Sequence, residues 1–520
     1  MPPDAWAAPS GRYNAAADLL DRHLTTDRAD HPACIDPTRQ LTYRQLVEQT
    51  HRWARALETL GVRAEERVVL IMTDTVDFPV AFWGTIRAGA VAVPLNTLLT
   101  NDQWRQMIED SRAAAVVVSA ELYDRAAPML QAIGAARVVV AGADRPGTRS
   151  FAALLASSPP EPVVAPTHAD EVAFWLYTSG STGVPKAARH LHASPAHTAR
   201  LYGKGIVGIG PDDVIFSAAK LFFAYGLGNG MSFPFSVGAT AILLPDRPTP
   251  DAVLGIIARH QPSIFCGVPT LYASLLAHPA LGRGAGSTRL RACLSAGEAL
   301  PEEIGRRWEQ TVGVEVLDGI GSTELLHIFI SNRPGQVRYG SSGKPVDGYR
   351  ARVVDEHGHD TKPGEIGELH VHGPTAADGY WNQRERSRKT FAGEWTATGD
   401  KYRLDEDGYF HYCGRADDLF KVGGVWVAPF EVESALLGHP AVLEAAVVGQ
   451  EDGDGLMKPK AFVVLKPGHP PTKELFDELR DHVKTVAGPW KYPRWIEARE
   501  ELPKTATGKI QRYRLRDNSP

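Results

Sequence analysis

The stretch Val172–Lys186, VAFWLYTSGSTGVPK, joins an apolar run to a loop of distinctive composition. The run Val172 to Tyr177 predicts a buried β-strand, because it is short, apolar and bounded by turn residues. The loop after it contains small hydroxyl residues, two glycines and one lysine. Glycine lets backbone N–H groups approach a ligand closely, so the loop predicts a cradle for a polyphosphate. A flexible Gly/Ser turn is the competing interpretation. The string is not a Walker A loop, because no Gly-Lys-Ser/Thr closes it.

Short β-branched runs recur on both sides of this stretch and alternate with longer segments rich in Ala, Leu and Arg. Such alternation predicts βα units, and therefore an α/β fold of mostly parallel sheets flanked by helices. An early helix is expected over Thr42 to Leu60, where apolar residues follow a period of about 3.6 residues. The expected strands are Val68–Met72, Ala115–Ser119, Val138–Ala141, Val172–Tyr177, Thr240–Leu244, Ser263–Gly267 and Val314–Leu317.

The composition changes from about Tyr339, where glycine and proline become frequent and short strands such as Glu368–Val371 lie between them. This change predicts a small β-rich subdomain over about residues 339–414. A second change follows Gly414-Arg415-Ala416-Asp417-Asp418, after which helical and strand-like segments alternate to the end of the sequence. We therefore expect a large N-terminal domain over residues 1–416 and a small α+β C-terminal domain over residues 417–520.

The overall composition excludes several classes of protein. The 56 basic and 61 acidic side chains of the 520 residues leave a formal net charge of -5, which gives no general attraction to nucleic acid or anionic lipid. The four cysteines have no CxxC or Cys/His ligand spacing, so we expect neither disulfides nor a zinc site, and a cytoplasmic location. Residues 1–14 lack an apolar core, and Arg87 interrupts the most apolar stretch, so neither a signal peptide nor a membrane span is expected.

Five further motifs follow the phosphate loop in a fixed order. They are Ser295-Ala296-Gly297-Glu298-Ala299, Asp318-Gly319-Ile320-Gly321-Ser322-Thr323-Glu324, Thr398-Gly399-Asp400, Gly414-Arg415-Ala416-Asp417-Asp418 and Pro503-Lys504-Thr505-Ala506-Thr507-Gly508-Lys509. In this order the motifs resemble those of the adenylate-forming superfamily, which contains acyl-CoA synthetases, peptide-synthetase adenylation domains and beetle luciferases. The resemblance covers about residues 40 to 515. It implies a large α/β domain followed by a small mobile domain, with a hinge at Asp417.

Two more strings resemble benzoate–CoA ligases in particular: Ser217–Asn229, SAAKLFFAYGLGN, and Leu326–Pro334, LHIFISNRP. The chain departs from that family at Lys186–His192, KAARHLH, where the family usually has KGVVHTH. The departure places Arg189 in an otherwise apolar strand. The two histidines of this string have no third ligand nearby in the sequence, so we interpret them as packing groups and assign them no metal.

The resemblance implies an ATP-dependent aryl-CoA ligase acting on benzoate or a substituted benzoate such as 2-aminobenzoate. The carboxylate would attack the α-phosphate of ATP to give an aryl adenylate and pyrophosphate, and CoA would then displace AMP. Two anions must approach each other in the first step, so catalysis needs positive charge and positioning. The implied catalytic residues are Lys509, Glu324, Thr182 and Lys186, of which Glu324 and Thr182 would hold Mg²⁺ through oxygen atoms.

The other implied site residues form three groups. The nucleotide group is Thr178, Ser179, Gly180, Ser181, Thr182, Gly183, Gly297, Glu298, Ala299, Asp318, Gly319, Ile320, Ser322, Thr323, Asp400 and Arg415. The aryl group is Phe222, Ala224, Tyr225, Gly321, His327 and Ile328, and the CoA channel group is Gly423, Gly424 and Lys421. Asp400 and Arg415 would contact ribose or phosphate, with a structural ion pair as the alternative. A core role is the alternative for Phe222.

Three other functions share this chemistry or this scaffold. A stand-alone aryl adenylation enzyme would load a carrier-protein phosphopantetheine, and a luciferase-type oxygenase would share only the first step. A non-catalytic nucleotide-binding protein predicts loss of Lys509, Glu324 or Asp400, all of which are present. A homodimer is the base-rate expectation for an enzyme of this kind. Acetylation of Lys509 would remove the charge that the first step needs, so we expect it to be inhibitory.

Overall fold

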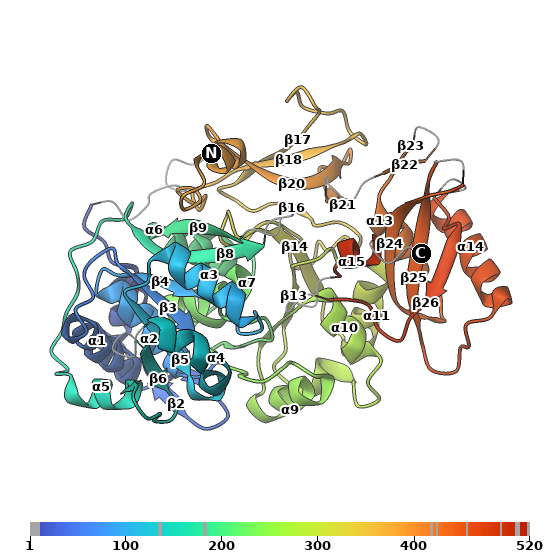
Figure 1. Ribbon diagram of the computed structural model, residues 1–520. Helices are drawn as coiled ribbons and strands as arrows, with labels where there is room; N and C mark the ends of the chain where they lie inside the picture. Colours follow the sequence, from blue (N-terminus) through green and yellow to red (C-terminus); the bar gives the residue numbers. More distant parts are fainter. Residues whose placement is uncertain are drawn as a thin grey trace.

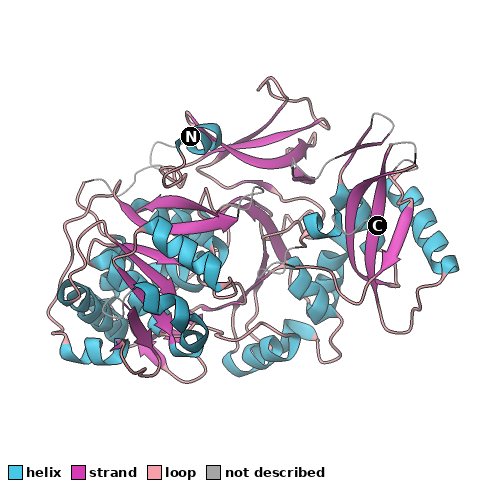
Figure 2. Cartoon of the chain, in the orientation of Figure 1, coloured by secondary structure: helices cyan, strands magenta, loops and turns pink. Residues whose placement is uncertain are grey.

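The computed structural model describes residues 11–133, 138–179, 185–415, 420–422, 425–453, 456–488, 491–504 and 510–516. Two large sheets and their helices form most of the molecule (Figure 1). A layer of strands coloured orange lies above them, and a separate small domain, coloured red, lies at the right. Figure 2 shows that helices cover the large sheets, whereas the upper layer is mostly strand and loop. The predicted α/β fold class is confirmed.

The first large sheet has seven strands in the order β7-β6-β5-β3-β4-β8-β9. All neighbours are parallel except β8 and β9, which form an antiparallel pair around the predicted phosphate loop. Its strands are β3 (Arg67–Ile71), β4 (Val91–Pro94), β5 (Ala115–Ser119), β6 (Val138–Ala141), β7 (Arg149–Ser150), β8 (Val172–Ser179) and β9 (Pro185–Leu191). Its helices are α1 (Tyr43–Thr59), α2 (Asp77–Arg87), α3 (Asn101–Ser111), α4 (Ala120–Ile133) and α5 (Phe151–Ser157).

The second large sheet has nine strands in the order β16-β15-β14-β13-β12-β10-β11-β1-β2, and it is parallel from β14 through β1. Its strands are β1 (Pro32–Ile35), β2 (Gln40–Thr42), β10 (Val214–Ser217), β11 (Thr240–Ile242), β12 (Ile264–Gly267), β13 (Ala292–Ser295), β14 (Val316–Gly321), β15 (Ile328–Ser331) and β16 (Lys344–Pro345). Its helices are α6 (Ala193–Thr198), α7 (Ala224–Leu227), α8 (Phe233–Val237), α9 (Pro250–His260), α10 (Pro269–Leu276) and α11 (Glu302–Val312).

Short π- and 3₁₀-helical segments complete this part of the chain. They are η2 (Ala17–Asp21), η3 (Arg22–Thr25), η5 (Ala199–Lys204), η6 (Gly228–Ser232) and η7 (Arg283–Gly286).

One buried cluster joins the two large sheets through α1 and α2. Helix α1 begins with a capping box, in which Thr42 accepts from the N–H of Gln45 and the Gln45 side chain accepts from the N–H of Thr42. Helix α2 is buried along its whole length, including Arg87, whose guanidinium lies 2.5 Å from Asp21. That pairing explains how the most apolar stretch of the sequence holds a charged residue. Among the described residues, no helix is long and apolar enough to cross a membrane.

The predicted β-rich subdomain is a five-stranded antiparallel sheet. Its elements are β17 (Arg350–Val354), β18 (Ile366–His372), α12 (Arg384–Thr390), β19 (Phe391–Ala392), β20 (Trp395–Leu404) and β21 (Phe410–Arg415). The elements after it are β22 (Phe420–Val422), β23 (Val425–Val427), α13 (Pro429–Leu437), β24 (Val442–Glu451), β25 (Met457–Leu465), α14 (Lys473–Ala487), β26 (Trp495–Ala498) and α15 (Arg512–Arg516). Strands β24, β25 and β26 form a sheet with its own buried cluster. The boundary at Asp417 stays a prediction, because that residue lies outside the described ones.

All four cysteines are buried and free of disulfides. Burial raises the pKa of every one of these thiols, to about 12 for Cys293 and Cys413. Cys266 and Cys293 lie on adjacent central strands, β12 and β13, of the nine-stranded sheet.

Candidate active site

The predicted motifs meet at the carboxyl edge of the nine-stranded sheet. Strands β13 and β14 are parallel neighbours, with Ser295 paired to Asp318, so the chain leaves both strands on the same side. The loop after β10 carries three predicted aryl residues, Phe222, Ala224 and Tyr225, and leaves the sheet at this edge too. The other three lie at the end of β14, Gly321, and just before and at the start of β15, His327 and Ile328. Loops at the carboxyl ends of parallel strands are the usual ligand sites of such sheets.

The antiparallel strands β8 and β9, which flank the predicted phosphate loop and form the phosphate hairpin, bring the predicted catalytic residues Lys186 and Glu324 together. Lys186 lies opposite Thr178 in the β8–β9 register, and its Nζ is 3.7 Å from Oε1 of Glu324. Between them stands Tyr380, whose Oη accepts a hydrogen bond from Lys186 at 3.2 Å and donates one to Glu324 at 2.6 Å. Tyr380 is buried and was not predicted from the sequence. Burial and the Glu324 carboxylate raise the pKa of Tyr380, so its hydroxyl keeps its proton.

Several predicted residues fall outside the described ones. These are Gly180, Ser181, Thr182, Gly183, Asp417, Gly423, Gly424 and Lys509, and the side chains of Ser179 and Lys421 are also not described. Their roles stay predictions.

The small domain contacts the predicted nucleotide residues Gly297–Ala299, which the motif resemblance places along one face of the adenine ring, opposite Asp318–Ile320. Gly297 is exposed and Glu298 is partly buried, and Oε1 of Glu298 accepts a hydrogen bond from the backbone N–H of Ile510 at 3.3 Å. Ile510 immediately follows Lys509, so the chain next to the predicted catalytic lysine lies beside these residues. Asp318 faces inward instead: its carboxylate accepts from the N–H of Leu300 at 3.3 Å, and burial raises its pKa to about 8.

The predicted ribose residues form an ion pair. Asp400 on β20 and Arg415 on β21 are cross-strand partners, and Nη1 of Arg415 lies 2.9 Å from Oδ1 of Asp400. The same nitrogen donates to the carbonyl of Thr398 at 3.2 Å. The structure therefore contains the ion pair that was the alternative interpretation, and the contacts with ribose stay predictions.

The predicted aryl residue His327 is buried against the ring of the predicted Tyr225 and against that of Phe233, which was not predicted. The ring of His327 lies 5.6 Å from that of Tyr225 and 4.5 Å from that of Phe233. A Cβ atom on Gly228 would lie 2.4 Å from Cδ2 of His327, so only glycine permits this approach. Burial lowers the pKa of His327 to about 3, with the Tyr225 carbonyl acting in the opposite direction, so the imidazole is neutral. Ile328 is buried beside it. The wall is aromatic and uncharged.

A tight turn orients His327. The N–H of His327 donates to the carbonyl of Leu325 at 2.8 Å, and Leu326 between them has a φ of 66°. A left-handed conformation costs a residue other than glycine on the order of 1 kcal/mol. Thr375 donates to the same Leu325 carbonyl at 2.7 Å and helps to hold the turn. Such strain is typical of functional sites, and nothing in the local sequence signals it.

A buried ion pair between Lys220 and Asp74 holds the loop that follows β10 and carries Phe222 and Tyr225. Lys220 donates to the carbonyl groups of Leu244, Pro245 and Asp246. Its Nζ is also 3.8 Å from Oδ2 of Asp74, which accepts from the N–H of the next residue along the loop. Burial raises the pKa of Asp74 to about 6 and lowers that of Lys220. A Cβ atom on Gly226 would lie 2.0 Å from the Lys220 carbonyl oxygen, so the loop folds directly back onto this residue.

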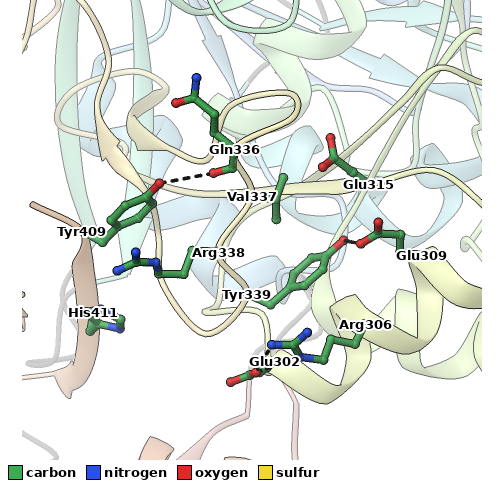
Figure 3. Close-up of a pocket in the computed structure, with 10 residues that line it drawn as sticks. All are labelled: Glu302, Arg306, Glu309, Glu315, Gln336, Val337, Arg338, Tyr339, Tyr409 and His411. Carbon is green, nitrogen blue, oxygen red and sulfur yellow. Dashed lines mark hydrogen bonds and ion pairs between the residues drawn. The ribbon is translucent and has the colours of Figure 1, made fainter. Parts of the chain in front are cut away.

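A cavity of about 680 Å³ lies away from these residues, between α11, residues 336–339 and β21 (Figure 3). Its charged side chains are paired with close neighbours: Glu302 with Arg306, Glu309 with Tyr339, Glu315 with the N–H of Gly335, Arg338 with Asp405 and Asp407, and His411 with Asp405. It contains none of the predicted site residues, so we do not interpret it as the active site.

A buried aromatic cluster around His327, a strand hairpin that places Lys186 beside Glu324, and a second domain whose Ile510 reaches the same edge agree with the resemblance to adenylate-forming enzymes. Comparison with known families agrees: residues 20–381 match the model of the AMP-binding enzymes, and residues 431–509 match that of the AMP-binding enzyme C-terminal domain. The chain belongs to the AMP-binding enzyme family. It is an acid–thiol ligase of the AMP-forming type, and the predicted superfamily is confirmed.

Similar proteins cover nearly the whole chain. The chain is 54% identical to a benzoate–CoA ligase of Thauera aromatica, over 97% of this chain and 96% of the relative. A solved benzoate CoA ligase from Burkholderia xenovorans has a TM-score of 0.91 and 50% identity, covering 97% of this chain and all of that one. A solved anthranilate CoA ligase with bound anthranoyl-AMP has a TM-score of 0.92 and 42% identity, covering 97% of each chain.

Replacing Lys220 by methionine tests the support of the acyl pocket. Lys220→Met removes the charge that binds three carbonyl groups and leaves Asp74 buried without its partner, so the loop carrying Tyr225 loses its position. We expect the KM for the carboxylic acid to rise about 10-fold with the KM for ATP unchanged. Steady-state kinetics measures both. Lys204→Met, at an exposed lysine, is the matched control, and equal KM values for the two variants would contradict the prediction.

Replacing Asp318 by asparagine tests its buried carboxyl. Because burial raises the pKa of Asp318 to about 8, the folded protein keeps a proton that the unfolded chain releases near pH 4. This stabilisation is complete below about pH 4 and is lost progressively as the pH rises from about 4 to about 8. Asp318→Asn removes the titration, so the free energy of unfolding of the wild type should fall relative to the variant by roughly 3 kcal/mol between pH 5.5 and 8.5. Urea unfolding of both proteins measures it; a pH-independent difference would contradict it.

Proposed function

We propose that this enzyme activates benzoate or a simple substituted benzoate, such as 2-aminobenzoate, as an aryl adenylate and transfers the aryl group to CoA. The observation that carries the proposal is the uncharged aromatic wall formed around His327 at the carboxyl edge of the nine-stranded sheet. A flat aryl ring fits such a wall, because aromatic side chains pack favourably against one another. The likeness to benzoate and anthranilate CoA ligases over nearly the whole chain supports it further.

In the first half-reaction, a carboxylate oxygen attacks the α-phosphorus of ATP, and the bond to pyrophosphate breaks. Both reactants are anions, so the main task of the enzyme is to position them and to supply positive charge. We assign this task to Lys509, which would bridge the carboxylate and the α-phosphate, and to Lys186 at the hairpin. The contact between Ile510 and Glu298 supports the assignment of Lys509, because it holds the neighbouring residue at the site.

Glu324 and Thr182 are the residues that would hold Mg²⁺. The half-buried carboxylate of Glu324 is an oxygen donor beside the phosphate hairpin, which suits a hard cation that takes most of its remaining ligands from phosphate and water. No group of three or more His, Cys, Asp or Glu side chains with metal-site geometry occurs in the part of the chain that the structure describes. A bound Mg²⁺ would neutralise the charge of the leaving pyrophosphate.

In the second half-reaction, the thiol of CoA attacks the carbonyl carbon of the aryl adenylate, and AMP leaves. We propose that rotation at Asp417 removes Lys509 and brings Gly423, Gly424 and Lys421 toward a channel for CoA. These four assignments rest on the resemblance of the motifs. Regulation by acetylation of Lys509, a homodimeric state and a cytoplasmic location are proposals of the same kind.

Pyrophosphate release tests the proposed substrate. The purified protein is supplied with ATP and Mg²⁺ and with benzoate, 2-aminobenzoate, 4-hydroxybenzoate, cinnamate or octanoate, each with and without CoA. We expect sustained turnover with the benzoates that requires CoA. A single burst that CoA does not extend would indicate a carrier-protein acceptor, and faster turnover with octanoate would contradict an aryl pocket.

Replacing Lys509 by alanine tests the first half-reaction separately. Removal of one electrostatic stabiliser should slow pyrophosphate release about 100-fold or more. The transfer of benzoyl groups from synthetic benzoyl-AMP to CoA should keep its rate. Lys504→Ala is the matched control, since Lys504 belongs to the same motif but its Nζ lies 2.6 Å from Glu444 within the small domain. Equal losses in both half-reactions of Lys509→Ala would contradict the assignment.

A further inference from the structure

A short segment of the β-rich subdomain, Ala377–Trp381, is hydrogen-bonded to both sides of the phosphate site. It runs antiparallel beside β9: the N–H of Arg189 donates to the carbonyl of Gly379, and the N–H of Trp381 donates to the carbonyl of Ala187. At its other end, the N–H of Ala377 donates to the carbonyl of Glu324 at 2.8 Å. The segment therefore connects β9, which contains Lys186, to the turn that carries Glu324.

Arg189 holds this segment in register. Its guanidinium lies 2.7 Å from Oδ2 of Asp378, and the N–H of Asp378 donates to the carbonyl of Arg189. This arginine is one of the residues at which the sequence departs from its family pattern, and its guanidinium pairs with the β-rich subdomain. The pairing accounts for the departure.

Tyr380, in the middle of the segment, points between Lys186 and Glu324. Its backbone N–H donates to Oγ of Ser387 at 2.9 Å, and its ring packs 5.4 Å from that of Phe391. Its hydroxyl accepts from Lys186 and donates to Glu324, and Lys186 Nζ also lies 4.7 Å from the centre of its ring. Hydrogen bonds therefore hold Tyr380 at its backbone N–H and at its side-chain hydroxyl.

We propose that Tyr380 is a positioning residue that keeps Lys186 and Glu324 ready for the phosphates and the magnesium ion of ATP. The proposal rests on the proposed roles of those two residues. The distance of 3.7 Å between their charged atoms exceeds that of a direct charge-assisted hydrogen bond. Without the hydroxyl, the two side chains would close into a direct ion pair that ATP and its metal must break. With it, the lysine and the carboxylate stay oriented and separate.

The test is the affinity for ATP in the presence of Mg²⁺, measured by calorimetric titration with no carboxylic acid present. Tyr380→Phe keeps the ring and removes only the hydroxyl, and we expect the dissociation constant to rise about 10-fold. The matched control is Tyr43→Phe, which removes another buried tyrosine hydroxyl, one that donates to the Ala239 carbonyl just before β11 and contacts neither Lys186 nor Glu324. An unchanged dissociation constant in Tyr380→Phe would overturn the proposal.

A second readout separates positioning from a general structural role. The transfer of benzoyl from synthetic benzoyl-AMP to CoA uses neither ATP nor its metal, so Tyr380→Phe should leave its rate unchanged. A loss there as large as the loss in ATP affinity would also overturn the proposal.

If Tyr380→Phe does not fold, Ser387→Ala provides a second variant, because it removes the acceptor of the Tyr380 N–H. It should also raise the dissociation constant for ATP, and an unchanged constant would overturn the proposal. Failure of the wild type to use any benzoate would refute the proposed substrate alone, because the titration contains no acid.

Discussion

Parallel pairing of β10, β12, β13 and β14 is the constraint on which the rest of the active site depends. Residues separated by about a hundred positions in sequence leave this sheet at one edge, since parallel strands end on the same side. The register pairs Ser295 with Asp318, so the predicted nucleotide residues that follow β13 lie beside those at the end of β14. Loops of different length and composition can therefore meet at one edge while the strands that carry them keep the same parallel arrangement.

Charge is distributed around this edge according to burial. The aryl wall contains a neutral histidine, and the charge of Lys220 lies beneath the loop, where three carbonyl groups surround it. The free ends of Lys186 and Glu324 lie at the boundary with solvent. An unpaired charge among the buried rings around His327 would cost several kcal/mol, whereas the proposed first half-reaction needs a cation at the hairpin to bring two anions together. These two requirements explain why the buried rings around His327 are uncharged while the charged ends of Lys186 and Glu324 lie near solvent.

The alternation of strand-like and helix-like segments and the resemblance of the ordered motifs made the fold predictable, whereas the roles of the predicted aryl residues stay predictions. Strands β5 and β6 have the predicted bounds, and the other predicted strands begin or end a few residues away. Tyr380 and Asp74 were not predictable, since each acts on residues far away in sequence. The strain at Leu326 was hidden for a different reason: tertiary hydrogen bonds impose a conformation that leucine itself disfavours.

The burial of the four cysteines has a consequence for an enzyme that makes thioesters. An acyl adenylate is an acylating agent, and the nucleophile it is meant to meet is the thiol of CoA. A protein thiol acts as a nucleophile mainly as the thiolate. The raised pKa values of Cys266 and Cys293 keep both sulfur atoms protonated within the nine-stranded sheet. Packing alone therefore makes the chain's own sulfur atoms poor competitors for the activated acyl group.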